Sequence, residues 1–110
     1  MIAPLFSIVV PTRDRPQELR RCLESLARCE FDHDRFEITI VNDGGLPLDQ
    51  GALRNAAPGL RLSVVNQPGR GPSAARNAGA AFSRGTFLVF TDDDCAPAAD
   101  WLARLESAIT

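Results

Sequence analysis

FLVFTDDDC, the stretch from Phe87 to Cys95, carries an apolar run directly into three consecutive carboxylates. A short and almost continuous apolar run is typical of a buried strand. Neighbouring carboxylates repel one another, so Asp92, Asp93 and Asp94 are most simply explained by a cation that offsets their charge. Mg²⁺ in proteins is commonly held by one or two carboxylates together with substrate phosphates. The stretch therefore predicts a strand that ends in a candidate binding site.

Three further strand-like segments lie upstream, and helical patterns separate them. All four share a short run of apolar or β-branched residues, and they are expected at 6–10, 36–41, 60–65 and 86–91. Strands that alternate with helices predict a mostly parallel sheet. We therefore expect an α/β fold, a single domain over residues 1–110 in which helices flank an open sheet of about four strands.

Helices are expected between and after these strands. The first begins near Pro16, and its apolar residues recur at helical spacing, at Leu19, Cys22, Leu23 and Leu26. The second begins at Ala74 with Ser73 as its N-cap, and the third follows Pro97. Residues 46–58 are expected to be weakly helical at best.

Polar residues follow three of the four expected strands. The first strand is followed by Pro11-Thr12-Arg13-Asp14, the second by Asn-Asp-Gly-Gly at 42–45, and the fourth by the acidic triplet. In open α/β sheets, ligands bind beyond the carboxyl ends of the strands, where the strand order reverses. If the first and fourth strands are neighbours, these three loops share one crevice.

Other side chains limit the chemistry available in that crevice. Arg76 lies in the first turn of its helix, where a positive charge gains nothing from the helix dipole, so it is a candidate for binding an anion. A solvated or ion-paired arginine is the alternative. The only histidine, His33, lies in a polar loop and is expected to be exposed, which excludes a Ser–His–acid triad. No GxxxxGK(S/T) loop is present, and a carboxylate-held metal that positions a phosphate-bearing substrate remains.

Composition bounds the class of protein. The 110 residues are 45% hydrophobic and 24% charged, which is ordinary for a globular domain. A net charge of −2 argues against a dedicated nucleic-acid binder. No apolar run approaches the roughly 20 residues of a membrane span. Three cysteines without CxxC spacing favour a reducing compartment, and hence a cytoplasmic location.

Three segments, in this order, resemble a known family. They are FSIVVPTRDRPQELRRCLESL from Phe6, IVNDGG from Ile40, and GPSAARNAGAAFSRGTFLVFTDDDC from Gly71. Together they resemble the N-terminal half of family 2 glycosyltransferases, which have the GT-A fold. The resemblance covers nearly the whole chain, and the combination of motifs is more specific than an acidic DXD triplet alone.

The resemblance implies a site for a nucleotide-sugar donor. It assigns seven residues to this donor: Pro11, Thr12, Asp14, Asp43, Arg76, Asp92 and Asp93. Pro11 and Thr12 would border the nucleotide, and Arg76 would lie near the base or the phosphates. Asp43 would hydrogen-bond the base, which is usually uracil in this family, so a UDP-sugar is the expected partner.

The same resemblance implies a divalent cation, Mn²⁺ or Mg²⁺, held by Asp94 and Asp92. In a DXD pair the first acid commonly faces the ribose, and the second faces the metal that bridges the diphosphate. Because the triplet contains three acids, a register of Asp93 with Asp94 stays open. The cation would stabilise the departing nucleoside diphosphate by neutralising its charge.

The sequence also departs from the family pattern. Arg13 stands where the family often has an aromatic residue. The acceptor half is missing, and the acid that serves as catalytic base in inverting members is expected beyond Thr110. We therefore expect the donor-binding half of a larger inverting enzyme, whose missing regions could hold it at the cytoplasmic face of a membrane. An unpaired sheet edge would favour a homodimer.

Three alternatives compete with this hypothesis. A sugar nucleotidyltransferase usually carries a Gly-rich basic loop after the first strand, whereas PTRDRP, from Pro11 to Pro16, has no glycine. A phosphatase of the haloacid dehalogenase type needs Thr or Val where Ala96 stands. A catalytically inactive module that binds a nucleotide sugar, a metal or another protein stays open.

Overall fold

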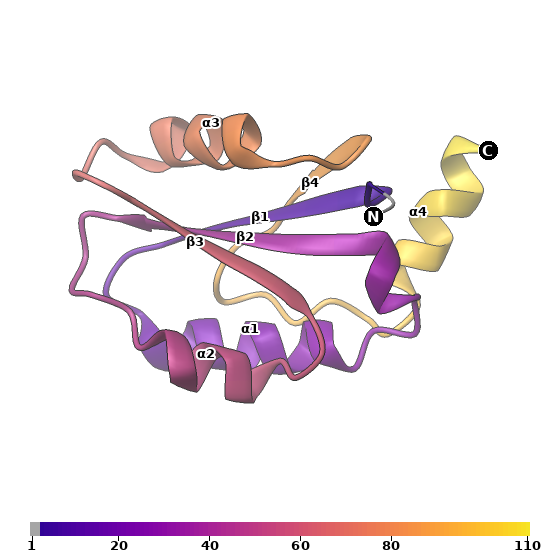
Figure 1. Cartoon of the computed structure of the whole chain (residues 1–110), viewed down its shortest axis with the longest axis horizontal. Helices are drawn as coiled ribbons and strands as arrows, with labels where there is room; N and C mark the ends of the chain where they lie inside the picture. Colours follow the sequence, from indigo (N-terminus) through magenta and orange to yellow (C-terminus); the bar gives the residue numbers. More distant parts are fainter. Residues whose placement is uncertain (1–2) are drawn as a thin grey trace.

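A four-stranded parallel sheet forms the centre of the molecule in the computed structural model, which describes residues 3–110 (Figure 1). Its strands are β1 (Phe6–Thr12), β2 (Phe36–Asp43), β3 (Arg61–Gln67) and β4 (Phe87–Phe90), in the order β3-β2-β1-β4. All three neighbouring pairs are parallel. The predicted α/β class is confirmed, and β1 and β4 are neighbours, which was the condition for a shared crevice.

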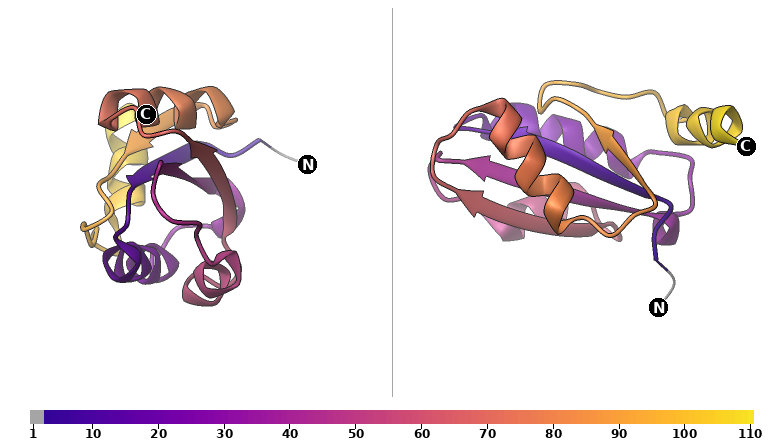
Figure 2. Two further views of the ribbon diagram at one scale, coloured as in Figure 1. Left: turned by 90° about the vertical axis from the view of Figure 1, so that its left-hand side faces the viewer. Right: turned by 90° about the horizontal axis from the view of Figure 1, so that it is seen from above.

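Helices cover both faces of the sheet, as Figure 2 shows from one end. Helices α1 (Pro16–Ala27) and α2 (Gln50–Ala56) lie together on one face, and α3 (Pro72–Phe82) lies alone on the other. A short 3₁₀ turn, η1 (His33–Arg35), precedes β2, and α4 (Trp101–Ile109) lies beside it, where Arg35 pairs with Glu106. The sheet is thus the middle layer of three.

Alternation along the strands divides the core between the two faces. Ile8 and Val10 of β1 belong to the larger cluster, together with the apolar face of α1 that the sequence predicted. Val9 points to the other face, where Val41 and Ala75 complete a smaller cluster beneath α3. Because successive side chains of a strand point to opposite faces, β1 and β2 are buried on both sides.

Helices α3 and α2 differ from the sequence predictions. Helix α3 begins two residues earlier than expected, with Gly71 rather than Ser73 as the N-cap and Pro72 as the first helical residue. Gly71 adopts φ +95°, a conformation that glycine tolerates, and the fixed φ of Pro72 already suits a helix. Helix α2 is a regular helix rather than a weak one, because the Asp49 side chain caps it through the Ala52 N–H.

A buried polar network sets where β4 starts beside β1. The Ser7 hydroxyl donates to Glu37 at 2.6 Å and accepts the Gly85 N–H at 2.7 Å. Glu37 also accepts the Arg84 N–H at 2.8 Å, so the α3–β4 turn is held by a fully partnered carboxylate. The register that follows aligns Phe90 with Val9 and directs the acidic triplet toward the end of β1.

One side of β4 is left uncovered. Helix α3 packs on β1, β2 and β3, while Val89 of β4 packs into the larger core on the opposite face. Leu88 and Phe90 therefore lie on the α3 side without a helix above them, and they are 43% and 46% exposed. In the part of the chain that the structure describes, β4 is also an edge strand, so the buried strand that the apolar run predicted is wrong for three of its four residues.

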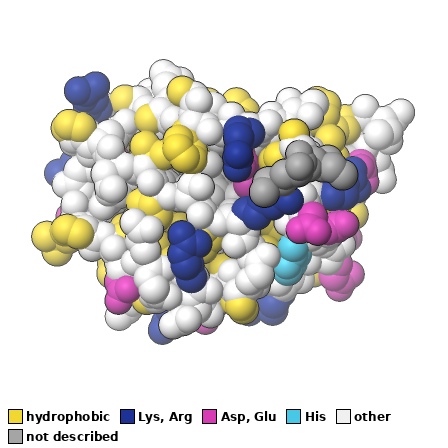
Figure 3. Space-filling view, in the orientation of Figure 1, with side chains coloured by type: hydrophobic (Ala, Val, Ile, Leu, Met, Phe, Trp, Pro, Cys, Tyr) yellow, Lys and Arg dark blue, Asp and Glu magenta, His cyan; other side chains and the backbone are white. Residues whose placement is uncertain are grey.

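Basic side chains do not gather on one part of the surface that Figure 3 shows. On the face shown in Figure 3, basic side chains are scattered among neutral ones and form no continuous basic area.

None of the helices within residues 3–110 has both the length and the apolar character needed to span a bilayer. His33 is half-buried rather than exposed, because its ring packs edge-on against Phe36, and η1 lies at the amino end of β2, away from the acidic triplet.

Candidate functional site

A pocket of about 290 Å³ opens at the carboxyl ends of β1, β2 and β4. Its lining includes seven of the eight residues that the sequence analysis selected, namely Pro11, Thr12, Asp43, Arg76, Asp92, Asp93 and Asp94. Arg13, Arg15 and Pro72 complete the lining. Residues that are more than eighty positions apart in the chain, from Pro11 to Asp94, therefore meet in one crevice, at the place that the topology of an open parallel sheet predicts.

Asp93 is the structural member of the acidic triplet. It is only 5% exposed, and its Oδ2 accepts a hydrogen bond from Thr12 Oγ1 at 2.8 Å. This bond joins the end of β1 to the loop that follows β4. Because the Asp93 carboxylate is already engaged within the protein, it is poorly disposed to face a ligand.

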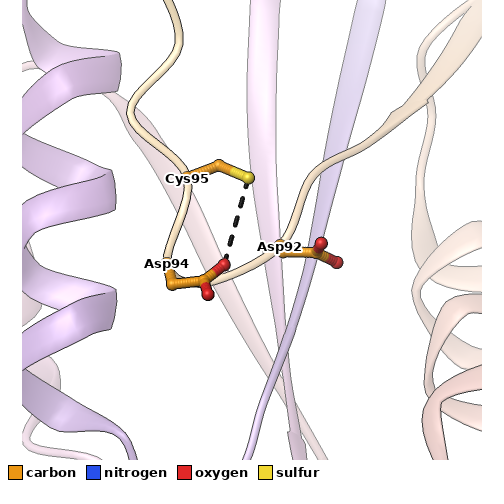
Figure 4. Close-up of side chains that lie close together, drawn as sticks. All are labelled: Asp92, Asp94 and Cys95. Carbon is orange, nitrogen blue, oxygen red and sulfur yellow. Dashed lines mark hydrogen bonds between the residues drawn. The ribbon is translucent and has the colours of Figure 1, made fainter.

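Asp92 and Asp94 are exposed, and they lie on the loop with Cys95 (Figure 4). One ligand atom from each of the three side chains lies within 4.8 Å of the others. Hard cations such as Mg²⁺ and Mn²⁺ prefer oxygen ligands, whereas a thiol is a softer donor. The two carboxylates therefore fit such a cation, with Cys95 at the margin, where its Sγ lies 4.0 Å from Asp94 Oδ1.

Arg15 is a site residue that the sequence reasoning missed. Its Nη1 lies 3.3 Å from Asp93 Oδ1 and its Nη2 lies 3.5 Å from Asp94 Oδ2. The guanidinium thus offsets part of the negative charge of the triplet from the loop that follows the neighbouring strand, β1. The sequence does contain an indication of this role, because Arg15 is a basic residue in the loop after β1, and that loop was expected to share a crevice with the acids.

Asp43 holds the loop between β3 and α3. Its Oδ1 accepts hydrogen bonds from Gln67 Nε2 at 2.8 Å and from the Arg70 N–H at 2.9 Å, and its Oδ2 accepts the Gly71 N–H at 3.0 Å. These bonds, the Arg70 N–H first among them, hold the pKa of the Asp43 carboxyl below its ordinary value. The carboxylate is therefore ionised at neutral pH and acts as an acceptor only.

Gly44 explains how this loop comes so close to β2. It adopts φ +81°, and a Cβ at this position would lie 2.5 Å from the Gly69 nitrogen. Two glycines therefore allow the backbones that follow β2 and β3 to touch. The Asn-Asp-Gly-Gly turn predicted from sequence is the element that makes this contact.

Asp14 lies outside the pocket, in contrast to the other selected residues. It has φ +52°, and its Oδ1 accepts the Leu46 N–H at 2.7 Å, which joins the loop after β1 to the loop after β2. It borders a separate, mostly apolar groove between α1 and α2. Contact between Asp14 and a nucleotide sugar stays a prediction, and the geometry gives this side chain a loop-holding role.

Arg76 is the fifth residue of α3, in the second turn rather than the first turn expected from sequence, and it is half-buried with its side chain at the pocket. Among residues 3–110, no carboxylate lies within 4.0 Å of its guanidinium. The ion-paired alternative considered from sequence is thus not what the described residues adopt. The site combines exposed carboxylates for a cation with an unpaired arginine for an anion.

Comparison with known proteins agrees with this arrangement. Residues 7–110 match the family described as glycosyl transferase family 2, which is nearly the whole chain. The chain therefore belongs to glycosyl transferase family 2.

Two curated relatives illustrate the family. The glycosyltransferase AglE of Haloferax volcanii is 27% identical over 97% of this chain and 36% of its own length. A PGL/p-HBAD biosynthesis glycosyltransferase of Mycobacterium tuberculosis is 35% identical over 99% of this chain and 43% of its own. The chain spans less than half the length of these relatives.

Solved structures show the same fold. TarS of S. aureus, solved with UDP-GlcNAc, superposes with a TM-score of 0.85 at 26% identity, over 94% of this chain and 30% of that one. The mannosyltransferase PcManGT of Pyrobaculum calidifontis, solved with GDP-Man and Mn²⁺, gives a TM-score of 0.81 at 27% identity, over 94% and 31%. The GT-A architecture expected from the sequence is confirmed.

Proposed function

We propose that this chain is the donor-binding part of an inverting, metal-dependent glycosyltransferase that uses a UDP-sugar. The observation that carries the proposal is the single pocket in which Thr12, Asp43, Arg76 and the acidic triplet converge. The complexes of TarS with UDP-GlcNAc and of PcManGT with GDP-Man and Mn²⁺ support a nucleotide-sugar ligand. UDP is the nucleotide that the sequence resemblance implies.

In this proposal the pocket divides the donor between its two ends. Asp43 takes the base end, and Asp92 and Asp94 take the diphosphate end, where Arg76 adds a positive charge from the second turn of α3. Thr12 and Asp93 hold the two walls together through their hydrogen bond. An acceptor oxygen would bond to the anomeric carbon with inversion while the bond from that carbon to the diphosphate breaks. We assign the base that takes the acceptor proton to none of the residues lining the pocket.

Asp92 and Asp94 would hold the divalent cation, Mn²⁺ or Mg²⁺, because their exposed carboxylates supply oxygen ligands near one another. When bound, the cation would neutralise charge on the departing diphosphate. Arg15 would then lose part of its contact with Asp94 and keep the one with Asp93, which lies deeper.

Ligand-dependent thermal stability tests the donor site. A ligand that binds the folded chain alone raises its Tm, so UDP with Mn²⁺ should raise the Tm of the 110-residue chain. Asp94→Ala should abolish this rise, because the cation loses a ligand. Asp34→Ala is the matched control, since Asp34 is an exposed carboxylate in η1, far from the pocket. If millimolar UDP with Mn²⁺ leaves the wild-type Tm unchanged, the proposal is wrong for this chain.

A second measurement separates an active enzyme from the inactive binding module that the sequence leaves open. The chain would be incubated with UDP-sugars and the release of UDP followed. We expect UDP to bind without turnover, since no base is assigned. Release of UDP by the 110-residue chain would contradict our view that it holds only the donor-binding part.

Two further assignments rest on sequence and stay proposals. We propose a cytoplasmic location because all three cysteines, which lie within the described residues, are free thiols. We also propose that the chain forms a homodimer through the exposed edge of β4.

A further inference from the structure

A second pocket lies between α1 and α2, on the face of the sheet opposite to α3 (Figure 2). We call it the α1–α2 groove. Its volume is about 440 Å³, against about 290 Å³ for the pocket at the acidic triplet, and Arg15 lines both. Ligand sites in proteins are mostly apolar concavities of this size, in which a few polar groups orient the ligand. The proposed function leaves this groove without a role.

Apolar side chains dominate the lining of the α1–α2 groove. Leu19 of α1 and Leu53 of α2 are buried and belong to the larger core cluster. Leu48 packs partly against the same cluster, whereas Leu46 lines the groove while 76% exposed. A ligand with an apolar body would remove part of this surface from water, and the gain grows with the apolar area that is buried.

The exposed Leu46 is held in place through both of its backbone groups. Its N–H donates to Asp14 Oδ1 at 2.7 Å, and its carbonyl oxygen accepts Asn42 Nδ2 at 2.9 Å. Asp49, at the end of the same loop, caps α2 through the Ala52 N–H. The groove is therefore formed before any ligand binds, which lowers the cost of ordering on binding.

Most of the charged groups in the lining already have partners. The carboxylates of Asp14 and Asp49 each accept a backbone N–H, and Arg15 pairs with the acidic triplet. Arg20 makes neither an ion pair within 4.0 Å nor a hydrogen bond with any residue from 3 to 110, and the Gln17 side chain makes no hydrogen bond there either. Arg20 is therefore the charged side chain of the groove that a ligand can engage.

Gln17 and Arg20 are three positions apart on α1, so their side chains lie on the same side of the helix. A guanidinium offers only donors, and the Gln17 amide offers two more. Hydrogen bonds from such groups are strongest when the acceptor is ionised, as in a carboxylate. Two donors beside an apolar groove therefore suit a ligand that joins an apolar body to a carboxylate.

We propose that the α1–α2 groove is a second ligand site, which takes a small molecule with an apolar body and a carboxylate. Arg20 and Gln17 bind the carboxylate, and the leucines of the groove contact the apolar body. This inference does not rest on the proposed function, because the groove needs neither a nucleotide nor a cation. Failure of UDP to bind the chain would leave it standing.

Titration of the isotope-labelled 110-residue chain with octanoate, followed by amide chemical shifts, tests the site. Octanoate should cause saturable shifts at the amides of Leu48, Ala52 and Leu53. Acetate at the same concentrations should cause none of them, because it has no chain to bury. Octylammonium, which would face the carboxylates of Asp14 and Asp49 instead, should bind roughly tenfold more weakly than octanoate, the scale of one charge-assisted hydrogen bond.

A variant that fills the groove tests the location. Ala52→Trp should abolish octanoate binding, because Ala52 lines the groove and is exposed, so an indole can occupy the groove without entering the core. Asn55→Trp is the matched control, since Asn55 is an exposed residue of the same helix that does not line the groove. It should bind octanoate as the wild type does.

A variant that leaves the apolar lining intact tests the charge. Arg20→Gln should weaken octanoate binding by roughly tenfold and should leave octylammonium binding unchanged, so that the preference for the carboxylate is lost. Arg21→Gln is the control, because Arg21 is exposed on α1 and does not line the groove. The preference should persist in this variant.

Several results would overturn the inference. The wild-type chain may not bind octanoate less well than Ala52→Trp or equally well, since binding in both would place octanoate elsewhere on the surface; absence of binding to the wild type counts the same way. Equal wild-type affinities for octanoate and octylammonium would show that Arg20 does not select a carboxylate. Groove amides that shift with protein concentration alone would mean that a second copy of the chain fills the groove.

Discussion

Asp43 is a residue whose local role and proposed binding role depend on the same charge. Two backbone N–H donors of the β3–α3 loop and the side chain of Gln67, at the end of β3, converge on its carboxylate, which orders that loop before any ligand is present. Order that is established on folding need not be established again on binding, so a preformed loop favours affinity. The loop that carries Gly69 and Gly71 is thus part of the site through Asp43.

We predict that Asp43→Asn lowers the Tm at neutral pH. An amide has one acceptor oxygen and would place its NH₂ group against a backbone N–H that now has a carboxylate partner. The pKa of Asp43 is lower in the folded chain than its ordinary value of 3.8, so its stabilising effect is full above that value and is lost as pH falls through the folded pKa. The difference in Tm between wild type and variant should therefore shrink in acid.

Thermal unfolding followed by circular dichroism between pH 7 and pH 3 measures this difference. Asp100→Asn is the control, because Asp100 is exposed and its one ion pair, with Arg104, is a surface contact at 3.8 Å. A constant Tm difference for Asp43→Asn across this range would show that the charge of Asp43 does not hold the loop.

At the scale of elements, α3 depends on a close approach to the sheet. A Cβ on Gly79 would lie 2.4 Å from Val9 Cγ1 and 3.1 Å from Val41 Cγ2. Both contacts are with β-branched side chains of central strands, which have little room to move. Because Gly79 has no side chain, the helix that carries Arg76 can pack closely against the sheet.

We predict that Gly79→Ala destabilises the chain by about 1–3 kcal/mol, the usual cost of overpacking, although alanine is the better helix former. Gly51→Ala in α2 is the matched control with the opposite sign. Gly51 is exposed, and an added Cβ would meet Asp49 Oδ1 at 3.4 Å, an ordinary contact. There the helix propensity of alanine should stabilise by up to about 1 kcal/mol. Urea unfolding measures both, and a stable Gly79→Ala variant would contradict the packing described for α3.

Elements with a strong local signal could be predicted from the sequence. The four strands are recognisable by their apolar runs, α1 by its helical periodicity, and the acidic loop by its composition. Helix α2 could not be predicted with the same certainty, since one buried leucine, Leu53, and the Asp49 cap give little periodicity in seven residues. The predicted N-cap of α3, Ser73, was wrong because Gly71 and Pro72 together outweighed the capping preference of Ser73.

The site could be predicted as a set of loops but not as a set of contacts. That Asp93 turns inward while Asp92 and Asp94 stay exposed depends on Thr12, from the neighbouring strand. The pairing of Arg15 with the triplet depends on the same neighbourhood. Side-chain partners across a sheet follow from strand register, which a single sequence does not give.

At the scale of the whole molecule, β4 carries three of the exposed large apolar side chains, Phe87, Leu88 and Phe90. Leu88 and Phe90 of β4 are 43% and 46% exposed, and Phe82, at the end of α3, is 54% exposed. The outer edge of β4 offers backbone groups that no strand among residues 3–110 pairs. Unpaired edges next to apolar surface are templates for association.

We predict that the 110-residue chain self-associates and that Phe90→Lys restores a monomer, because a charge on the edge strand opposes pairing. Light scattering coupled to size exclusion, at tens of micromolar protein, gives the mass. Leu46→Lys is the control, since Leu46 is 76% exposed but lies after β2, at the apolar groove beside α1. A monomeric wild-type mass would exclude the homodimer proposed for this edge.

The rate at which Cys22 reacts with a thiol reagent reports how often the acidic loop over it opens. Its thiol is buried behind the acidic loop, 3.8 Å from the Asp92 carbonyl oxygen, and burial raises its pKa to about 12. Cys95 is exposed on that same loop. A thiol reagent would therefore modify Cys95 at once and would reach Cys22 only when the loop lifts from α1. The ratio of the labelling rates of Cys22 and Cys95 therefore measures how often the pocket wall opens.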